Sequence, residues 1–389
     1  MTHYLSEDTK AILLICGVFG KDRSHKPLTT REYSKLVRWL VKMELRPADL
    51  LNMKSLSEVE VSTGLEKERL KSLIGRGVQL GFAVEEWQRS GIWVVSRSDE
   101  AYPARLKKQL KDKAPPLIFG AGNQSLLKGG GLAVVGSRNV DEKGSIFTQE
   151  VAEVCARNGM PVISGGARGV DQVSMVSVLE AGGVTIGVLA ENLLKKSVER
   201  SARMAIADDR LLLISPYHPT ARFTVGTAMG RNKLIYAMAD YGLIVSADYK
   251  KGGTWAGAEE ELKRDNGIPV FVRVENGVLK GNKKLLELGA FSWPASLDKV
   301  GLKDQLELLS SGNTNVIPRQ ELDLFSSGSF HTSDPIPLKD KVSEKVSEKT
   351  EEYKPDTDKT SNQASVYDVV LPILLEACKK PMKVDDLAI

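Results

Sequence analysis

Three arginines stand in polar or glycine-rich loops that each follow an apolar run of the sequence. Arg138 follows the run 132–135, Arg168 follows the run 161–164, and Arg231 ends a long loop further along the chain. Glycines let a ligand approach the backbone N–H groups, and the planar guanidinium of arginine binds phosphate through several donors. These residue types at this spacing predict a site for a phosphate-rich ligand.

The elements that would position these loops alternate between strands and helices. The apolar runs are short and rich in β-branched residues, which is typical of strands buried on both faces. Helical stretches such as 143–158 and 255–265 separate them. This alternation predicts a doubly wound parallel α/β sheet, in which the loops at the carboxyl ends of the strands share one edge. The expected strands are 132–135, 161–164, 184–190, 211–215, 243–247 and 269–274.

The candidate contacts with phosphate lie in loops at this edge. The first loop supplies a serine and an arginine, and the second loop, 164–171, leaves room for a ligand through three glycines. Asp171 is expected to be structural at the site, because no partner acid or nucleophile accompanies it in the sequence. The residues that we expect to bind phosphate are Gly136, Ser137, Arg138, Ser164, Gly165, Gly166, Arg168, Gly169, Lys196, Arg231 and Asn232.

Each candidate also has a structural interpretation, which the sequence leaves open. The first loop would then be a tight turn with a surface arginine, and Lys196 would belong to a solvated helix start. Arg231 would pair with Asp240 or Asp171. Asp171 would otherwise cap the helix that follows it or hold Arg168 or Arg138 in place.

Aromatic and acidic residues beyond the last glycine-rich loop are expected to be structural. Trp255 would stack on a base or, as is more common after a loop, belong to the core or a subunit contact. Glu259, Glu260 and Glu261 are expected on a solvated helix face.

The composition is that of a globular binding protein. The 389 residues are 42% hydrophobic, and a formal net charge of +4 permits nucleic-acid binding without arguing for it. Three widely spaced cysteines form no CxxC pair, which suits a reducing cytoplasm and offers no zinc site. The apolar run 11–19 is too short to span a bilayer, so we expect no membrane association. Because the sequence has no Ser-His-Asp set, paired carboxylates or P-loop, we expect no enzyme, no catalytic residue and no cofactor.

Changes in composition divide the chain into four expected parts. Residues 1–90 are expected to form a helical domain of the SAM or helix-hairpin kind, and residues 91–305 the domain that contains the α/β sheet, which the resemblance given below makes a Rossmann-like, DNA-binding domain. Polar and charged residues dominate 306–364, which predicts a disordered linker. Residues 365–389 are apolar again and resemble part of a winged-helix domain.

Several motifs in series resemble the DNA-processing protein A family, also called DprA or Smf. The match has the family's order and spacing over about residues 60–275, and the chain resembles a divergent member. The motifs are Tyr102-Pro103, 114–120, Val135-Gly136-Ser137-Arg138, 164–171, 183–189 and Arg231-Asn232.

This resemblance implies a fold, a ligand and partners. It implies an extended Rossmann-like domain that binds single-stranded DNA in the cytoplasm and forms a homodimer. It also implies protection of DNA and the loading of a RecA-type recombinase, in natural transformation or DNA recombination. Arg138 would contact a DNA phosphate, together with the loop 164–171.

Departures from the family pattern leave two other functions open. The usual Tyr-Pro step is missing at 191–194, so Lys196 matches the family's lysine only loosely. Glycines and threonine at 252–254, followed by glutamates, resemble phosphoribohydrolases of the LOG type. A mononucleotide would then bind, and Glu259 or Glu260 would act in N-glycosidic cleavage. The other alternative is an assembly factor that binds a protein partner and little DNA.

Overall fold

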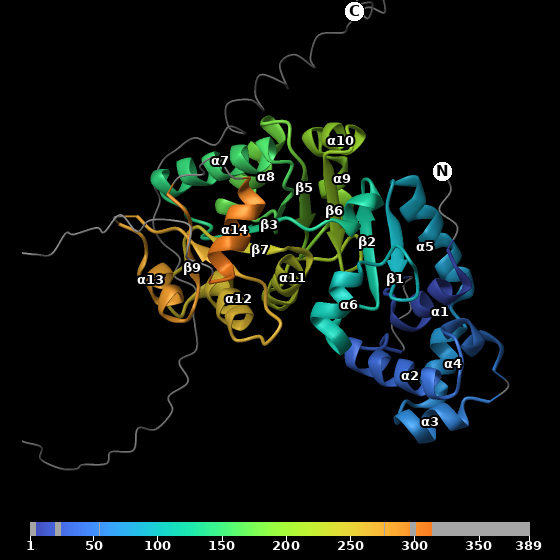
Figure 1. Cartoon of the computed structure of the whole chain (residues 1–389). Helices are drawn as coiled ribbons and strands as arrows, with labels where there is room; N and C mark the ends of the chain where they lie inside the picture. Colours follow the sequence, from blue (N-terminus) through green and yellow to red (C-terminus); the bar gives the residue numbers. More distant parts are fainter. Residues whose placement is uncertain (1–4, 20–24, 54, 276, 296–300, 313–389) are drawn as a thin grey trace, which may run out of the picture. The chain divides into compact units, whose positions relative to one another are not determined.

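The computed structural model of the chain describes residues 5–19, 25–53, 55–275, 277–295 and 301–312 (Figure 1). These residues belong to one compact unit that extends to residue 319, and a second unit covers 320–389. The expected winged-helix-like segment 365–389 and the expected linker beyond residue 312 lie outside the described residues.

Helices form the N-terminal part of the first unit, as the helical spacing of its leucines predicts. Leu36 and Leu40 on α2 and Leu70 on α4 are buried. Thr29 and Glu32 form a reciprocal capping box that satisfies backbone N–H groups at the start of α2. The elements are α1 (Glu7–Cys16), α2 (Thr30–Lys42), the 3-10 helix η1 (Pro47–Asn52), α3 (Ser57–Thr63), α4 (Lys67–Ile74) and α5 (Gly77–Arg89).

The described residues form a sheet of nine strands in the order β1-β2-β6-β5-β4-β3-β7-β8-β9. Strands β1 and β2 are antiparallel, and the other seven run parallel to one another. All six strands expected from the sequence are present. The strands are β1 (Trp93–Ser96), β2 (Leu117–Ala121), β3 (Leu132–Val135), β4 (Val162–Ser164), β5 (Thr185–Val188), β6 (Leu211–Ser215), β7 (Tyr241–Ile244), β8 (Val270–Val272) and β9 (Phe291–Ser292).

Helices cover both faces of the parallel strands, so the prediction of a doubly wound α/β sheet is confirmed. Leu132 and Val134 pack into one hydrophobic cluster, whereas Ala133 and Val135 pack into another, because side chains alternate along a strand. In Figure 1, α7 and α8 lie above the strands and α11 and α12 lie below. The helices are α6 (Ala104–Leu110), α7 (Glu142–Arg157), α8 (Val170–Glu180), α9 (Leu193–Val198), α10 (Arg200–Ala207), α11 (Val225–Met238), α12 (Gly252–Leu262), α13 (Lys280–Glu287) and α14 (Leu302–Ser310), with 3-10 helices η2 (Lys111–Lys113) and η3 (Gln124–Lys128).

The N-terminal helices share a hydrophobic cluster with the antiparallel end of the sheet. Ile12 of α1 and Leu36 of α2 belong to the same cluster as Leu117 of β2. The hydroxyl of Thr9 donates a hydrogen bond of 2.6 Å to Asp99, which follows β1. The expected boundary at residue 90 stays a prediction.

The end of the sheet region lies beyond the expected boundary at residue 305. Helix α14 continues to Ser310, and Leu306 is buried in the cluster beneath α7. The first residues of the expected linker, 306–310, are therefore helical, because their leucines pack onto the sheet region.

Candidate phosphate-binding site

The strand order reverses between β3 and β7. The chain adds β4, β5 and β6 on one side of β3 and then places β7 and β8 on the other side. Ligands of open α/β sheets bind in the crevice outside the carboxyl ends of the strands at such a reversal. The loops that follow β3 and β7 are therefore the expected walls of a site.

A cavity of about 380 Å³ lies at this reversal. Its walls come from the loops after β3 and β7, the start of α8, one side of α11 and the start of α12. Six residues named from the sequence line it, namely Gly136, Ser137, Arg138, Asp171, Arg231 and Asn232. Fourteen further residues complete the lining: Val135, Ala167, Phe223, Val225, Ala228, Met229, Tyr236, Ser246, Ala247, Asp248, Lys251, Gly252, Gly253 and Thr254.

A buried ion pair stands in this lining. Arg231 Nη1 lies 3.5 Å from Asp171 Oδ2, and the two residues are 4% and 7% exposed. Of the two partners that the sequence left open for Arg231, the structure selects Asp171, because Asp240 instead pairs with Arg105. Within the described part of the chain, Arg231 Nε has no hydrogen-bond partner. The guanidinium therefore keeps donor capacity for an anion in the cavity.

The charges of this pair depend on each other. Burial raises the pKa of the Asp171 carboxyl, while Arg231 and the N–H groups of Ala167 and Gly165 lower it. Burial likewise lowers the pKa of Arg231, and Asp171 raises it. An arginine remains charged in such a setting, so the cavity retains a buried cation. Asp171 holds Arg231 and accepts from the loop before α8, and its purely structural role at the site stays a prediction.

The glycines of the second loop serve mainly to bring chain segments together. A Cβ on Gly165 would lie 1.0 Å from Arg231 Nη1, so only glycine leaves room for the guanidinium. Gly169 has φ +84°, and its Cβ would lie 2.3 Å from the carbonyl oxygen of Ser137. Gly165 thus makes room for a side chain of α11, and Gly169 lets the loops after β3 and β4 approach each other. This differs from the expectation that these glycines leave room for the ligand itself.

Ser164 is not placed to contact a ligand in the cavity. Its side chain is fully buried, and its hydroxyl donates a hydrogen bond of 2.7 Å to the carbonyl oxygen of Val134. The expectation of a phosphate ligand is corrected to that of a bond between β4 and β3.

Arg138 is exposed at the rim of the cavity. Its guanidinium carbon lies 5.2 Å from the centroid of the Phe223 ring, a distance at which cation–π attraction holds the side chain. Ser137 has less hydrogen-bonding capacity for a phosphate than expected, because its N–H donates to Ser246 and its hydroxyl accepts from the N–H of Asn139. Arg138 is thus the exposed cation beside the buried Arg231.

Several other candidates lie apart from the cavity. Arg168 is exposed and donates a hydrogen bond to Asn139. Lys196 lies on α9 beyond β5 and forms an ion pair of 3.0 Å with Glu199. Gly166 is exposed on the loop before α8. None of these three described residues lines the cavity. Any phosphate that they contact would lie outside the cavity, along the same edge of the sheet.

The start of α12 belongs to the site, although the glycines and threonine at 252–254 were not among the residues that we expect to bind phosphate. We expected a helix from Trp255, but α12 begins at Gly252, so the loop glycines belong to its first turn. No side-chain cap satisfies this described helix start, and Thr254 donates a hydrogen bond of 3.0 Å to the carbonyl oxygen of Gly136. Uncapped N–H groups and the helix dipole favour an anion at that place. The two glycines followed by threonine were the sequence pattern that could have indicated a phosphate-binding helix start here.

The glutamates expected on a solvated face of α12 form hydrogen bonds and ion pairs within the protein. Glu261 is only 2% exposed and accepts the N–H of Ile268 at 2.9 Å, which corrects the expectation of solvation. Glu259 accepts from Trp255 and pairs with Lys263. Trp255 itself is buried in the core, so it presents no surface for a base.

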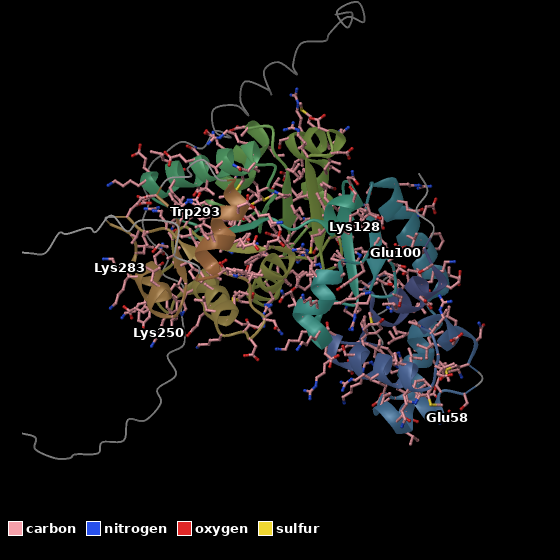
Figure 2. All side chains as sticks on the ribbon, in the orientation of Figure 1. Glu58, Glu100, Lys128, Lys250, Lys283 and Trp293 are labelled. Atoms are coloured by element: carbon pink, nitrogen blue, oxygen red, sulfur yellow. The ribbon has the colours of Figure 1, made fainter. Side chains whose placement is uncertain are left out.

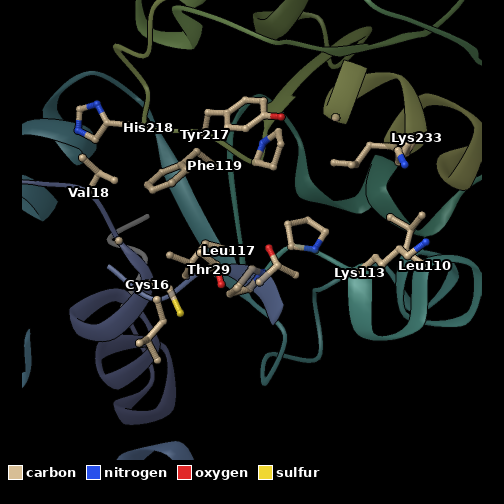
Figure 3. A pocket seen from close by; sticks show the side chains of 18 residues that line it. Cys16, Val18, Thr29, Leu110, Lys113, Leu117, Phe119, Tyr217, His218 and Lys233 are labelled. Carbon is tan, nitrogen blue, oxygen red and sulfur yellow. The ribbon is translucent and has the colours of Figure 1, made fainter. Parts of the chain in front are cut away.

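A second cavity of about 380 Å³ lies between the N-terminal helices, β2 and the loop after β6 (Figure 3). Its lining is mostly apolar, and it includes Phe119, Leu117 and three prolines. No residue that we expect to bind phosphate lines this cavity within the described chain. The cavity between β3 and β7 is therefore the candidate site.

Two further structural findings limit the chemistry of the described residues. No group of three His, Cys, Asp or Glu residues among them is placed to hold a metal ion. None of their helices is both long and apolar enough to cross a membrane.

Comparison with known proteins identifies relatives of the chain. A family model described as DNA recombination-mediator protein A matches residues 93–300, more than half of the 389 residues. The DNA processing protein DprA of Streptococcus pneumoniae is 30% identical over 197 residues, which are 49% of this chain and 67% of that protein. DprA of Bacillus subtilis is 28% identical over 186 residues, which are 47% of this chain and 61% of that protein. The matches thus span about two thirds or less of the relatives' own lengths.

A solved structure shows the same fold. The X-ray structure of DprA from Streptococcus pneumoniae superposes with a TM-score of 0.59 at 21% sequence identity. The superposition covers 75% of this chain and 95% of that one. At this identity the likeness concerns the fold, and it agrees with the expected extended Rossmann-like sheet.

Proposed function

The chain belongs to the DNA recombination-mediator protein A family, and we propose that the cavity between β3 and β7 binds the phosphate backbone of single-stranded DNA. The observation that carries this proposal is the convergence of Arg231, Arg138 and the uncapped start of α12 on one cavity. A family role in DNA recombination and the names of the curated relatives agree with it.

Each group has a distinct part in binding. Arg231 is held in place by Asp171 and Gly165, and it offers its remaining donors to one phosphate. Arg138 supplies a second, exposed charge at the rim, and the N–H groups of α12 bind an oxygen without adding a side-chain charge. Contacts of this kind recognise the backbone and carry no base code, so binding is independent of sequence.

The rival nucleotide-hydrolysing function lacks the groups that it needs. Glu259 and Glu260, the carboxylates that would act in cleavage, are paired with lysines and stand outside the lining of the cavity. The carboxylates within the lining are Asp248 and Asp171, and Asp171 is paired with Arg231. We therefore propose a binding protein without catalytic activity.

The partners belong to the same proposal. Membership of the family supports a homodimer that works in the cytoplasm, protects single-stranded DNA and delivers it to a RecA-type recombinase. Such a protein would act in DNA uptake or recombination. Sedimentation measures the dimer, and assembly of RecA filaments on coated single strands measures the delivery.

Replacement of Arg138 tests the site. Arg138→Ala removes one phosphate contact, so affinity for all sequences falls alike and the slope of log K against log salt becomes shallower by about 0.7. Fluorescence anisotropy with labelled oligo-dT at several salt concentrations measures both quantities. Arg203→Ala on α10, which also removes an exposed arginine, is the matched control and keeps the wild-type slope. Equal slopes for the two variants would refute the assignment of Arg138.

A further inference from the structure

Four exposed lysines lie beside the cavity on the side of β7 and β8. Lys250 and Lys251 follow β7, and Lys280 and Lys283 stand on α13. Within the described chain none of the four forms an ion pair, whereas the neighbouring Lys284 pairs with Glu287. Figure 2 labels Lys250 and Lys283, which project from the surface beside α13. Unpaired charges of one sign at one edge create a positive potential there.

Acidic neighbours offset this potential only in part. Asp248 lies two residues before Lys250 and lines the cavity. Glu275 lies 3.6 Å from the buried Arg273 and is therefore already engaged. Glu259 also interacts electrostatically with Lys250, but it is paired with Lys263 at 2.8 Å, so the four lysines keep a net positive charge toward solvent.

An aromatic ring brings two of these lysines together. Lys250 Nζ lies 5.3 Å and Lys280 Nζ lies 5.6 Å from the centroid of Tyr249. The ring itself packs edge-on against the buried Trp255, with centroids 4.9 Å apart. Cation–π attraction thus holds two ammonium groups from different elements at the same ring.

The backbone conformation of Lys250 is one that residues with a side chain seldom adopt. Lys250 has φ +56°, a left-handed conformation that costs free energy for a residue with a side chain. Such outliers persist where the surroundings fix them, and they gather at ligand-binding sites. The conformation turns Lys250 toward Tyr249 immediately after the loop that lines the cavity.

Helix α13 is firmly attached to that loop. The fully buried Asn282 donates to the carbonyl oxygens of Val245 and Arg273, and its Oδ1 accepts the N–H of Ala247. A Cβ on Gly281 would lie 2.0 Å from the carbonyl oxygen of Ala247, so the contact is close. The lysines of α13 are therefore held at a fixed place relative to the cavity.

We propose that Lys250 and Lys280 form, around Tyr249, a second phosphate subsite for the strand that occupies the cavity. The proposal rests on the proposed function. Lys251, which lines the cavity, connects the two subsites. The strand runs from Arg138 across the carboxyl ends of β7 and β8 toward α13.

A double replacement with strands of two lengths tests this path. Lys250→Ala with Lys280→Ala removes two contacts at the second subsite and leaves the cavity intact. Lys67→Ala with Lys71→Ala is the control, since both exposed lysines lie on α4 and removing them changes the net charge equally. Anisotropy is measured with oligo-dT of about 4 and about 16 nucleotides, the range of site sizes for single-strand-binding domains.

The expected result depends on length. The double variant at the second subsite binds the long strand about tenfold more weakly, and its salt slope is shallower by about 1.4, while its affinity for the short strand matches the wild type. The α4 control behaves as the wild type with both strands. If the variant matches the control on the long strand while Arg138→Ala still weakens binding, the second subsite is wrong and the cavity stands. If the wild type binds neither strand, both proposals fall.

Discussion

Gly165 and Asp171 together determine where the guanidinium of Arg231 lies. Gly165 leaves the space in which its guanidinium lies, and Asp171 pairs with one end of the fork. A buried pair of this kind adds little to stability, because the desolvation of two charges offsets their attraction. Its value here is orientation, since a fixed guanidinium presents its remaining donors to the cavity.

Replacement of Arg231 by lysine separates this geometry from charge. Lysine keeps the positive charge but has a single ammonium, which cannot hold Asp171 and bind phosphate in the same way. We expect Arg231→Lys to weaken binding of oligo-dT by about tenfold, or about 1.4 kcal/mol. Arg138→Lys is the matched control, because exposed Arg138 acts mainly by charge, and it should change affinity little. Similar affinities of the two variants would mean that charge alone matters at Arg231.

Gly165→Ala tests the room for the guanidinium. The added Cβ must displace Arg231, so we expect the free energy of unfolding to fall by about 1–3 kcal/mol and affinity for oligo-dT to fall with it. Chemical denaturation and anisotropy measure the two effects. Gly81→Ala on α5 is the control, because nothing lies within 4 Å of its added Cβ and alanine favours the helix. Unchanged binding by Gly165→Ala would show that Arg231 is not a contact.

At the scale of elements, the sequence predicts the strands well and the site less completely. Apolar runs such as 132–135 predict β3 because a strand buried on both faces needs apolar residues throughout. Ser164 ends the expected strand 161–164 and was expected to bind phosphate, but it is buried and donates a hydrogen bond to the carbonyl oxygen of Val134. Such a partner comes from a neighbouring strand, so no local pattern reveals it.

The same limit explains two other differences. Glu261 is buried because the N–H of Ile268 beyond the helix needs an acceptor, which a helical pattern does not show. Lys196 follows a strand as expected, yet β5 stands two places from β3 in the sheet, so it lies away from the cavity. The order of strands, and with it the convergence of loops, is a tertiary property.

One contact between helices makes stability depend on pH. Arg69 of α4 donates to the Glu32 carboxylate of α2 at 2.7 Å, and this bond is the main cause that lowers the pKa of Glu32 to about 2 from 4.5. The unfolded chain then binds the proton first as pH falls. The stabilisation is therefore complete above pH 4.5 and disappears as pH falls toward 2.

The size of this effect is measurable. Between pH 5 and pH 2, the wild type should lose about 1 kcal/mol more than Glu32→Gln in the free energy of unfolding. Urea denaturation at each pH gives the comparison. Glu85→Gln, which removes an exposed pair with Arg89 on α5, should retain the wild-type dependence. Parallel curves for wild type and Glu32→Gln would contradict the contact.

At the scale of the whole molecule, the site is complete within the first compact unit. The cavity and all its lining residues lie before residue 255, and the second unit begins at residue 320. We expect deletion of residues 320–389 to leave the melting temperature and the affinity for oligo-dT unchanged. Calorimetry and anisotropy check this expectation. A large fall in either quantity would mean that the second unit supports the site.

The central claim is that the edge of the sheet binds a single-stranded polymer through its phosphates. The most direct measurement is a titration of the intact protein with labelled oligo-dT, a matched duplex and a labelled mononucleotide at about 50 and about 200 mM salt. The account predicts tight binding of the single strand that weakens steeply with salt, and much weaker binding of the mononucleotide. Tight binding of the mononucleotide without binding of the strand would contradict it and favour a nucleotide pocket.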